Sequence, residues 1–517
     1  MPSTDLLKQF GLSRNPFTDR TAEKTSLDDT SLYIHSDLQG FTPSDTTYIF
    51  FGRRGSGKTT IRLQMQKAYD EYNEKVRSSG KSRGHFMVDI CRPGHMTACL
   101  RNFQHAVHCN DDNWDAQFGD TWTSADMVDC ILSFAASELV DKMTDPSSLE
   151  GKEMLERVKA DARTSKQMLL LAHLYAKTDS ASLAQLRAAL IRPRYSATEV
   201  TVGVGVGVSV AAGATAAAKD PRAADILSAP FVKVLDEVDR FAPALRTHPR
   251  ATLAAALLTT LCGGYYYSRY TRNRGLERAA SLTSNIRVVK QQPAPLMAAL
   301  LSHLFTTHDK VDTIRGMCIG ISAHQKLDLL SNLVKLLGYE SVAVFGDCFD
   351  EVGLLDPVQY PGAIKAFARE VCRNDLLNFG RLHFFFPDSR LALDLNTDKT
   401  LKEARFDRHF VRDLTWSRHQ LEELAERRFI AAQKMARQNL ALVDHPEQTE
   451  AICLAFADLF KKVGNEDFAS CFNKISTPRE LMIMMTEMMG RIEAHPENGI
   501  TAQDLEFAVN KALEQAV

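Results

Sequence analysis

Apolar positions follow two different patterns along this chain, and each pattern predicts one kind of element. Short, nearly continuous apolar runs of five or six residues are typical of strands buried in a sheet. Such runs occur at 47–51, 85–90, 341–345 and 382–386. Elsewhere, apolar residues mostly recur every three to four positions, as in amphipathic helices. Strands separated by helices predict an α/β fold with a parallel sheet.

Four regions of the chain show the helical pattern. A helix is expected directly after the first strand, at 59–76, and further helices across 95–190 and 291–338. From about residue 415 onward the pattern is helical to the end of the chain, without another apolar strand. The helices expected there cover 417–438, 447–462, 478–493 and 501–515. This stretch predicts a C-terminal helical domain.

Composition narrows the class of protein. The chain has 517 residues, of which 44% are hydrophobic and 24% charged, so it can form several folded domains. Its formal net charge of −2 provides no basic field for nucleic acid, which makes a nucleic-acid partner an unfavoured interpretation. The ten cysteines form no CxxC pair, a pattern that favours a reducing compartment over a disulfide framework or a zinc site.

The first strand leads into a glycine-rich motif. The segment YIFFGRRGSGKTT, residues 48–60, fits the pattern G-x-x-x-x-G-K-[ST]. Glycines at this spacing let successive N–H groups point inward and surround phosphate oxygens, and the following helix adds its positive N-terminus. Lys58 would reach the β- and γ-phosphates of ATP, and the Thr59 hydroxyl would ligate Mg²⁺. The residues predicted to bind the nucleotide are Gly52, Gly55, Ser56, Gly57, Lys58, Thr59 and Thr60.

Such a loop requires a carboxylate across the sheet to support the metal. We favour the segment SVAVFGDCFDEV, residues 341–352, because its apolar run is continuous and ends in acidic residues. Asp347 would contact Mg²⁺ through water, and Glu351, or else Asp350, would orient or deprotonate the attacking water. Alternatively, Asp350 and Glu351 are only a solvated acidic helix start.

A second acidic segment is the alternative. The segment FVKVLDEVDRF, residues 231–241, also ends in carboxylates. Its strand is interrupted by Lys233, and it lies between two unusual apolar stretches. We therefore rank it second.

These motifs resemble those of the AAA+-like and STAND-like P-loop ATPases, particularly the KAP type. The resemblance covers about 40% of the chain and is specific only at the phosphate loop. It is carried, besides the loop, by residues 10–23, 335–351, 381–390, 404–424 and 476–481. It implies an ATPase whose Asp388 or Ser389 senses the γ-phosphate and whose Arg479 is a second sensing residue.

One position departs from the family pattern. Many AAA+ proteins have Glu directly after the metal-binding Asp, whereas this chain has Cys348 there. Arg405 and Arg408, like Arg479, are candidates for arginine fingers, because a guanidinium suits the charge that develops on a transferred phosphoryl group. Surface salt bridges are the alternative role of these arginines.

Two further segments are apolar and uncharged. Residues 200–218 and 251–267 have lengths that can cross a bilayer as helices, and Tyr265–Tyr267 followed by arginines resembles an interfacial belt. The KAP resemblance implies a transmembrane hairpin at this location. Against it, the Val-Gly alternation of 202–210 also fits a β-strand, which would leave a soluble cytoplasmic protein.

The combined prediction is a P-loop NTPase with a parallel sheet flanked by helices, a two-helix transmembrane insertion and a C-terminal helical domain. Its expected parts are an N-terminal segment at 1–45, an NTPase domain at 46–195 and 276–414, an insertion at 196–275 and a helical domain at 415–517. It would be a Mg²⁺-dependent ATPase acting as a membrane-tethered switch with its nucleotide domain in the cytosol. Homo-oligomers are expected because active sites of this type often extend across a subunit contact.

Two other functions stay open. A nucleotide-gated scaffold would bind ATP without significant hydrolysis, and Cys348 after Asp347 is the feature that favours it. A DNA-acting ATPase would require a basic recognition module, which the near-neutral charge disfavours.

Overall fold

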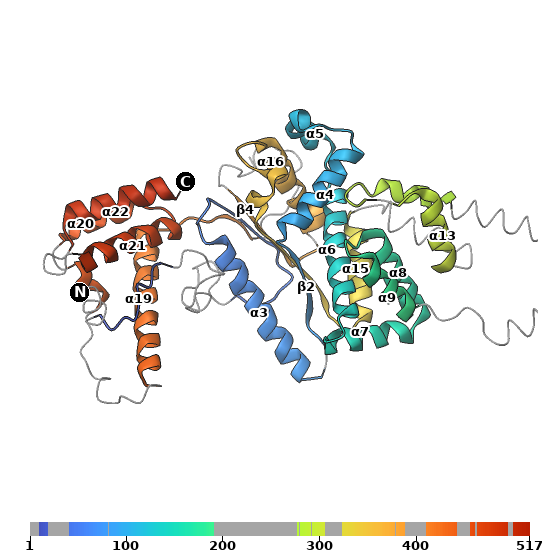
Figure 1. The fold of residues 1–517 in the computed structure, drawn as a ribbon, viewed down its shortest axis with the longest axis horizontal. Helices are drawn as coiled ribbons and strands as arrows, with labels where there is room; N and C mark the ends of the chain where they lie inside the picture. The colour runs from blue at the N-terminus through green and yellow to red at the C-terminus, as the bar shows by residue number, and fades with distance from the viewer. Residues whose placement is uncertain are drawn as a thin grey trace, which may run out of the picture.

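The computed structural model describes most of the predicted elements. It describes residues 10–18, 41–80, 82–190, 277–278, 280–290, 292–304, 323–377, 379–387, 410–441, 455–460, 463–494 and 500–516. Figure 1 shows a central sheet, a helical layer built around α6 on one side of it, and a separate group of C-terminal helices on the other.

The sheet has five strands, all parallel, in the order β2-β3-β4-β1-β5. The strands are β1 (Tyr48–Gly52), β2 (His85–Ile90), β3 (Ser341–Gly346), β4 (Leu382–Pro387) and β5 (Phe410–Asp413). The prediction of an α/β fold with a parallel sheet is confirmed. The four apolar runs all form strands, whereas β5 was not predicted, because two of its four residues are charged.

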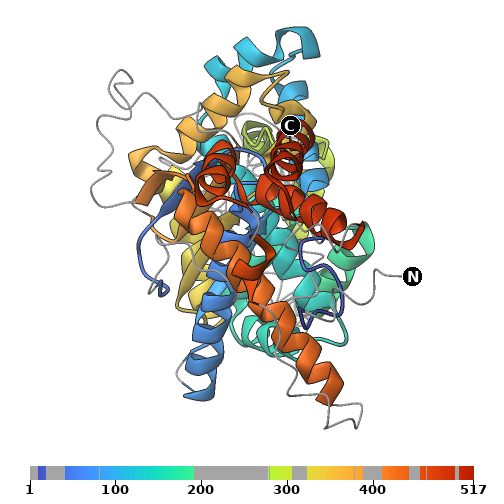
Figure 2. The ribbon, with the colours of Figure 1, turned by 90° about the vertical axis from the view of Figure 1, so that its left-hand side faces the viewer.

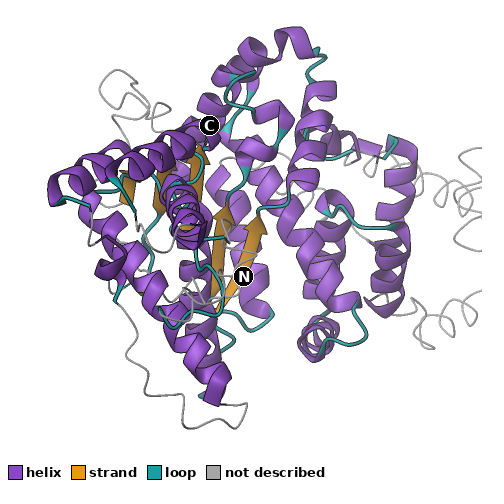
Figure 3. Ribbon diagram, turned by 60° about the vertical axis from the view of Figure 1, so that its left-hand side comes forward, coloured by secondary structure: helices purple, strands orange, loops and turns teal. Residues whose placement is uncertain are grey.

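Each strand separates two packed faces, as the alternation of side chains requires. Phe50, Phe345 and Phe385 face α3 (Lys58–Ser78), which contributes Ile61 and Met65 to this smaller core. The neighbouring positions of the strands point the other way, into the main core formed with the helical layer. Figure 3 shows the strands enclosed between helices. Covering on both faces explains why these strands are continuously apolar.

The helical layer is mainly an insertion between β2 and β3. It consists of α4 (Pro93–Ala106), α5 (Trp114–Thr121), α6 (Ser124–Thr144), α7 (Leu149–Ala160), α8 (Ala162–Tyr175), α9 (Ser180–Leu190), α13 (Ala294–Leu304) and α15 (Ala323–Leu336). Between β3 and β4 lie η6 (Phe349–Glu351), η7 (Gly353–Leu355), α16 (Pro361–Val371) and α17 (Asn374–Leu377). Helix α6 is buried along most of its length, which makes it the centre of the layer.

The C-terminal helices have a hydrophobic core of their own. They are α19 (Arg418–Ala441), α20 (Asn465–Lys474), α21 (Pro478–Ala494) and α22 (Ala502–Gln515), with the short η11 (Phe456–Phe460). Phe10, Leu12 and Phe17 from the N-terminal segment complete this core. The methionines of α21 are buried in it, so they serve packing. Figure 2 shows this bundle in front of the sheet.

Three of the predicted C-terminal helices agree with α19, α21 and α22. The helix expected at 447–462 differs, because its described part is the 3₁₀ turn η11, and α20 was not predicted. The proposed membrane segments, 200–218 and 251–267, lie outside the described residues, as does the alternative acidic strand at 231–241. Within the described ranges, no helix has the length and apolar character needed to span a bilayer.

Candidate functional site

The glycine-rich loop connects β1 to α3 at the carboxyl edge of the sheet. Gly55 and Gly57 have φ values of 83° and 88°, in the left-handed region that favours glycine. Gly57 precedes the first residue of α3, and its carbonyl accepts the helical hydrogen bond from Ile61 at 3.0 Å. The loop therefore ends directly at a helix N-terminus, where unpaired N–H groups favour an anion.

Lys58 lies at the start of this helix and is folded back over the loop. Its Nζ donates to the carbonyl oxygens of Gly52, at 2.9 Å, and Arg53, at 3.1 Å. The side chain is only 7% exposed. Burial lowers the pKa of the ammonium, while the carboxylates of Asp350 and Asp347 act in the opposite direction. These carbonyls hold a cation at the mouth of a loop that is suited to phosphate.

The next residue connects the loop to the acidic strand. Thr59 Oγ1 donates to Asp347 Oδ2 at 2.9 Å, across 288 positions of sequence. Asp347 follows β3 directly and is 3% exposed. The fold thus brings together the hydroxyl and the carboxylate that were predicted as the metal pair.

Ser56 provides a second sign that the loop is built for a ligand. Its Oγ atom is buried and has no hydrogen-bond partner among the described residues. A buried polar atom without a partner is unfavourable, so such an atom in a loop of this geometry fits a site that receives polar groups from a ligand. Thr60 lies next to the loop in the first turn of α3 and is half-buried.

The residue types fit magnesium better than a metal held by protein ligands alone. No group of three or more His, Cys, Asp or Glu side chains forms a metal cluster in the described part of the chain. Mg²⁺ is usually bound through one or two carboxylates together with waters and substrate phosphates. Thr59 and Asp347 would hold the ion on the protein side, and it would supply charge neutralisation for the phosphates.

The two carboxylates predicted to act on water lie beside this pair. Asp350 and Glu351 belong to η6, where Asp350 is half-buried and Glu351 is exposed. Cys348 precedes them with a φ of 61°, so the chain turns sharply after Asp347. Burial, reinforced by Asp347 and Glu351, raises the pKa of the Cys348 thiol to about 12. Cys348 is therefore neutral at physiological pH and does not replace a carboxylate.

The C-terminal bundle contacts the loop from outside. Trp416 Nε1 donates to the Ser56 carbonyl oxygen at 2.8 Å, and the Arg479 amide donates to the Gly55 carbonyl at 3.2 Å. A Cβ atom on Gly55 would lie 2.4 Å from Arg479 Cβ. Arg479, predicted as a sensing residue, thus lies in the first turn of α21, against the loop. Trp416 was missed, because its position carries no motif.

Two more charged residues at this edge were also missed. Arg62 Nε donates to Asp347 Oδ2 at 3.3 Å, and Arg62 Nη1 lies 3.6 Å from Asp89 Oδ2. The position of Arg62, three residues after Thr59, places both on one face of α3 and could have indicated it. Asp388, Ser389, Arg405 and Arg408 lie outside the described residues.

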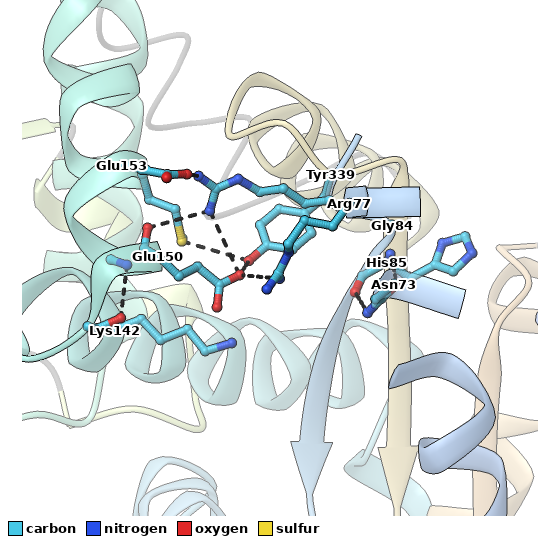
Figure 4. A network of polar contacts seen from close by, with 12 residues as sticks. Asn73, Arg77, Gly84, His85, Lys142, Glu150, Glu153 and Tyr339 are labelled. Atoms are coloured by element: carbon cyan, nitrogen blue, oxygen red, sulfur yellow. Dashed lines mark hydrogen bonds and ion pairs between the residues drawn. The ribbon is translucent and has the colours of Figure 1, made fainter. Parts of the chain in front are cut away.

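A second polar network lies at the opposite, amino edge of the sheet (Figure 4). The Glu150 carboxylate accepts a hydrogen bond from the Tyr339 hydroxyl and pairs with Arg77 at 3.4 Å and Arg83 at 3.8 Å. Burial opposes ionisation of Glu150, but the Tyr339 bond and the nearby cations prevail and lower its pKa. These contacts join α7 to the entrances of β2 and β3, so they stabilise the fold.

Comparison with protein-family models, with curated proteins and with solved structures found no match for this chain. The sheet order, the phosphate loop and the Thr59–Asp347 contact therefore carry the functional argument by themselves.

Proposed function

We propose that the protein binds a nucleoside triphosphate, taken as ATP, together with Mg²⁺ and hydrolyses it. The phosphates would lie in the loop from Gly52 to Thr60, with Lys58 turning from the loop carbonyls to the β- and γ-phosphates. Asp347 would support the water shell of the cation, and Glu351, or else Asp350, would orient the attacking water.

The observation that carries the proposal is the hydrogen bond from Thr59 to Asp347. A glycine-rich loop alone is a common surface turn. A loop hydroxyl after β1 that reaches a buried carboxylate at the end of the parallel strand β3, one strand further along the sheet, is the arrangement that phosphate-bound magnesium requires. Ligands of open α/β sheets also bind at this carboxyl edge.

The C-terminal bundle would be the part that responds to the nucleotide. Trp416 and Arg479 hold loop carbonyls directly, so any movement of the loop backbone on phosphate binding changes their hydrogen bonds. A switch needs contacts that differ between its states. Gain or loss of these contacts would move the bundle relative to the sheet.

The test is direct measurement on the purified full-length chain. We expect Mg²⁺-dependent binding of ATP and steady phosphate release in the wild type. Lys58→Ala should lose binding, whereas Glu351→Gln should keep binding and lose turnover. Failure of the wild type to bind any nucleoside triphosphate in the presence of Mg²⁺ would refute the proposal.

A nucleotide-gated scaffold is the second candidate, and Cys348 is the observation that favours it. A neutral thiol follows Asp347 where many related ATPases have Glu, and Glu351 is exposed. A scaffold would bind ATP tightly and release phosphate at the same negligible rate in the wild type and in Glu351→Gln. The difference in phosphate-release rate between the wild type and Glu351→Gln therefore distinguishes an ATPase from a scaffold.

We also propose that the segments 200–218 and 251–267 tether the protein to a membrane, with the nucleotide domain on the cytosolic side. Their length and lack of charge support this. An even number of crossings keeps both nucleotide motifs on one side. Extraction of the protein from membranes only by detergent, and not by high salt or alkali, is the expected result. Recovery in the soluble fraction would favour a cytoplasmic protein.

Self-association is the last part of the proposal. Arg405, Arg408 or Arg479 would serve a neighbouring copy, since a guanidinium is suited to charge on a transferred phosphoryl group. Light scattering with and without ATP and Mg²⁺ should show a larger assembly in the presence of nucleotide. A monomer under both conditions would contradict this part.

A further inference from the structure

The helix after the phosphate loop carries a deeply buried arginine. Arg62 lies on α3, three residues after Thr59, and is 6% exposed. Residues three apart on a helix lie on the same face, so Arg62 points toward the same edge of the sheet as Thr59. A buried guanidinium is costly unless carboxylates or other acceptors surround it.

Carboxylates on two neighbouring strands meet Arg62. Its Nε donates to Asp347 Oδ2 at 3.3 Å, the same oxygen that accepts the Thr59 hydroxyl at 2.9 Å. Its Nη1 lies 3.6 Å from Oδ2 of Asp89, a residue of β2. Nη1 also donates to Gln66 Oε1 at 3.1 Å. Arg62 therefore bridges the two acidic positions and fixes one oxygen of Asp347.

Attachment of α3 to the sheet does not explain this contact. Ile61, Met65 and Tyr69 already bury the apolar face of the helix against the strands. What Arg62 adds is orientation, because a planar guanidinium holds two acceptors in fixed directions, which a lysine ammonium does not do. The group that it orients is the carboxylate assigned to magnesium.

We propose that Arg62 is a positioning residue for magnesium, holding Asp347 in the orientation that supports the cation, and that Asp89 anchors Arg62. This inference rests on the proposed function, since it concerns the same site. Residues that orient the groups around a metal typically change its affinity 10–100-fold when they are substituted. In this arrangement Asp89 acts on the magnesium site through Arg62.

The experiment measures the Mg²⁺ concentration that gives half-maximal binding of a fluorescent ATP analogue to the full-length chain. Arg62→Met should raise that concentration roughly 10–100-fold and leave binding in EDTA little changed. Arg62→Lys should also raise it, because a lysine cannot bridge both carboxylates. Asp89→Asn should cause a smaller increase. Gln66→Ala is the matched control, since it removes an uncharged partner of the same arginine, and it should match the wild type.

Two results would overturn the inference. One is an Arg62→Met protein with lowered thermal stability but wild-type magnesium dependence, which would make Arg62 a structural ion pair only. The other, decisive if Arg62→Met does not fold, is wild-type magnesium dependence in both Arg62→Lys and Asp89→Asn. A wild type without magnesium-dependent affinity for nucleotide would instead refute the proposed function, a separate outcome visible before any variant is made.

Discussion

The two edges of the sheet both bury polar groups, yet they are built differently. At the amino edge, contacts among Tyr339, Glu150 and Arg83 join different elements. His383 is fully buried there, and its Nε2 lies 2.9 Å from the Tyr69 hydroxyl oxygen. At the carboxyl edge, Thr59 and its neighbours converge on one carboxylate, next to a loop of glycines in left-handed conformations.

This difference is what distinguishes the structural network at the amino edge from the candidate binding site at the carboxyl edge. The amino-edge contacts connect one element to another and give their polar groups partners, although His383 Nδ1 has none among the described residues. The carboxyl-edge contacts surround a place where backbone amides, an ammonium and a carboxylate meet, and there the Ser56 hydroxyl stays without a partner among the described residues. Both edges bury charge and gather several groups around one carboxylate, Glu150 or Asp347, whereas only the second does so beside a glycine-rich loop that ends at a helix N-terminus.

The largest expected effect is that of Lys58→Ala on nucleotide binding. Loss of the ammonium should weaken ATP affinity roughly 10–100-fold, because a hydrogen bond to a charged group contributes about 1.5–3 kcal/mol. Isothermal titration calorimetry would measure it. Lys177→Ala is the control, since Lys177 Nζ also donates to a backbone carbonyl, that of Gly94 at 3.1 Å, which is not part of the loop. Equal affinity in the two variants would contradict the comparison.

His383→Gln should change the pH dependence of stability at the amino edge. Burial lowers the pKa of His383 to about 3, below its ordinary value of 6.5, so the unfolded chain binds this proton first as the pH falls. The stability that neutral His383 contributes is complete above pH 6.5 and decreases toward pH 3.

Between pH 6.5 and 4 this loss amounts to about 3 kcal/mol for one histidine. In urea unfolding experiments across that range, the free energy of unfolding of His383→Gln should therefore decrease less with falling pH than that of the wild type. His105→Gln, at an exposed histidine, should keep the wild-type slope. An unchanged slope in His383→Gln would show that this edge does not respond to protons through His383.

Gly55→Ala should separate the C-terminal bundle from the loop. The left-handed φ of 83° costs about 1–2 kcal/mol for a residue with a Cβ atom, and this Cβ would also meet Arg479 Cβ at 2.4 Å. Gly80→Ala is the control, because Gly80 has a φ of 68° but no atom within 4 Å of such a Cβ. Both should lose stability, but only Gly55→Ala should red-shift Trp416 emission and expose the 414–418 connection to protease.

Tyr339→Phe should have the smallest effect. It removes the hydroxyl that donates to Glu150, a partner that is 29% exposed, and the loss of folding stability should be about 1 kcal/mol. Nucleotide affinity should match the wild type, because the network lies at the other edge. Tyr72→Phe, which loses a hydroxyl bonded to Glu340 at a more solvated position, should cost less. A change in ATP affinity for Tyr339→Phe would show that the edges are coupled.

Elements of the fold could be predicted from the sequence where a short contiguous stretch carries a clear pattern. The runs around Phe50, Val344 and Phe385 predicted three strands, because a strand covered on both faces must be apolar throughout. The edge strand β5 has one neighbour, β1, and carries Arg412 and Asp413, so its pattern is too weak to predict. The helix expected at 447–462 failed in its described part because periodicity does not distinguish a 3₁₀ turn from an α-helix.

The residues of the candidate site also fall into two groups, those that the sequence predicted and those that only the fold revealed. The loop is one contiguous motif, and Asp347 follows a recognisable strand, so both were predicted. Arg62 and Trp416 matter through contacts 285 and 360 positions away, and neither is visible without the fold. Only the helical spacing of Arg62 from Thr59 was available beforehand.

The strand order has a consequence for how this chain is made. Strands β1 and β2 do not pair with each other. Strand β1 pairs with β4 and β5, and β2 pairs with β3. In the β2–β3 pair, His85 lies opposite Ser341, which comes 256 positions later in the sequence. A ribosome adding about 5–20 residues per second needs roughly 13–50 seconds to cover that interval. During this time β1 and β2 have both been synthesised, while the strands that pair with them have not. We expect the helical layer, which is synthesised in this interval and packs against β2 through α6, to cover β2 until the second half of the sheet is synthesised.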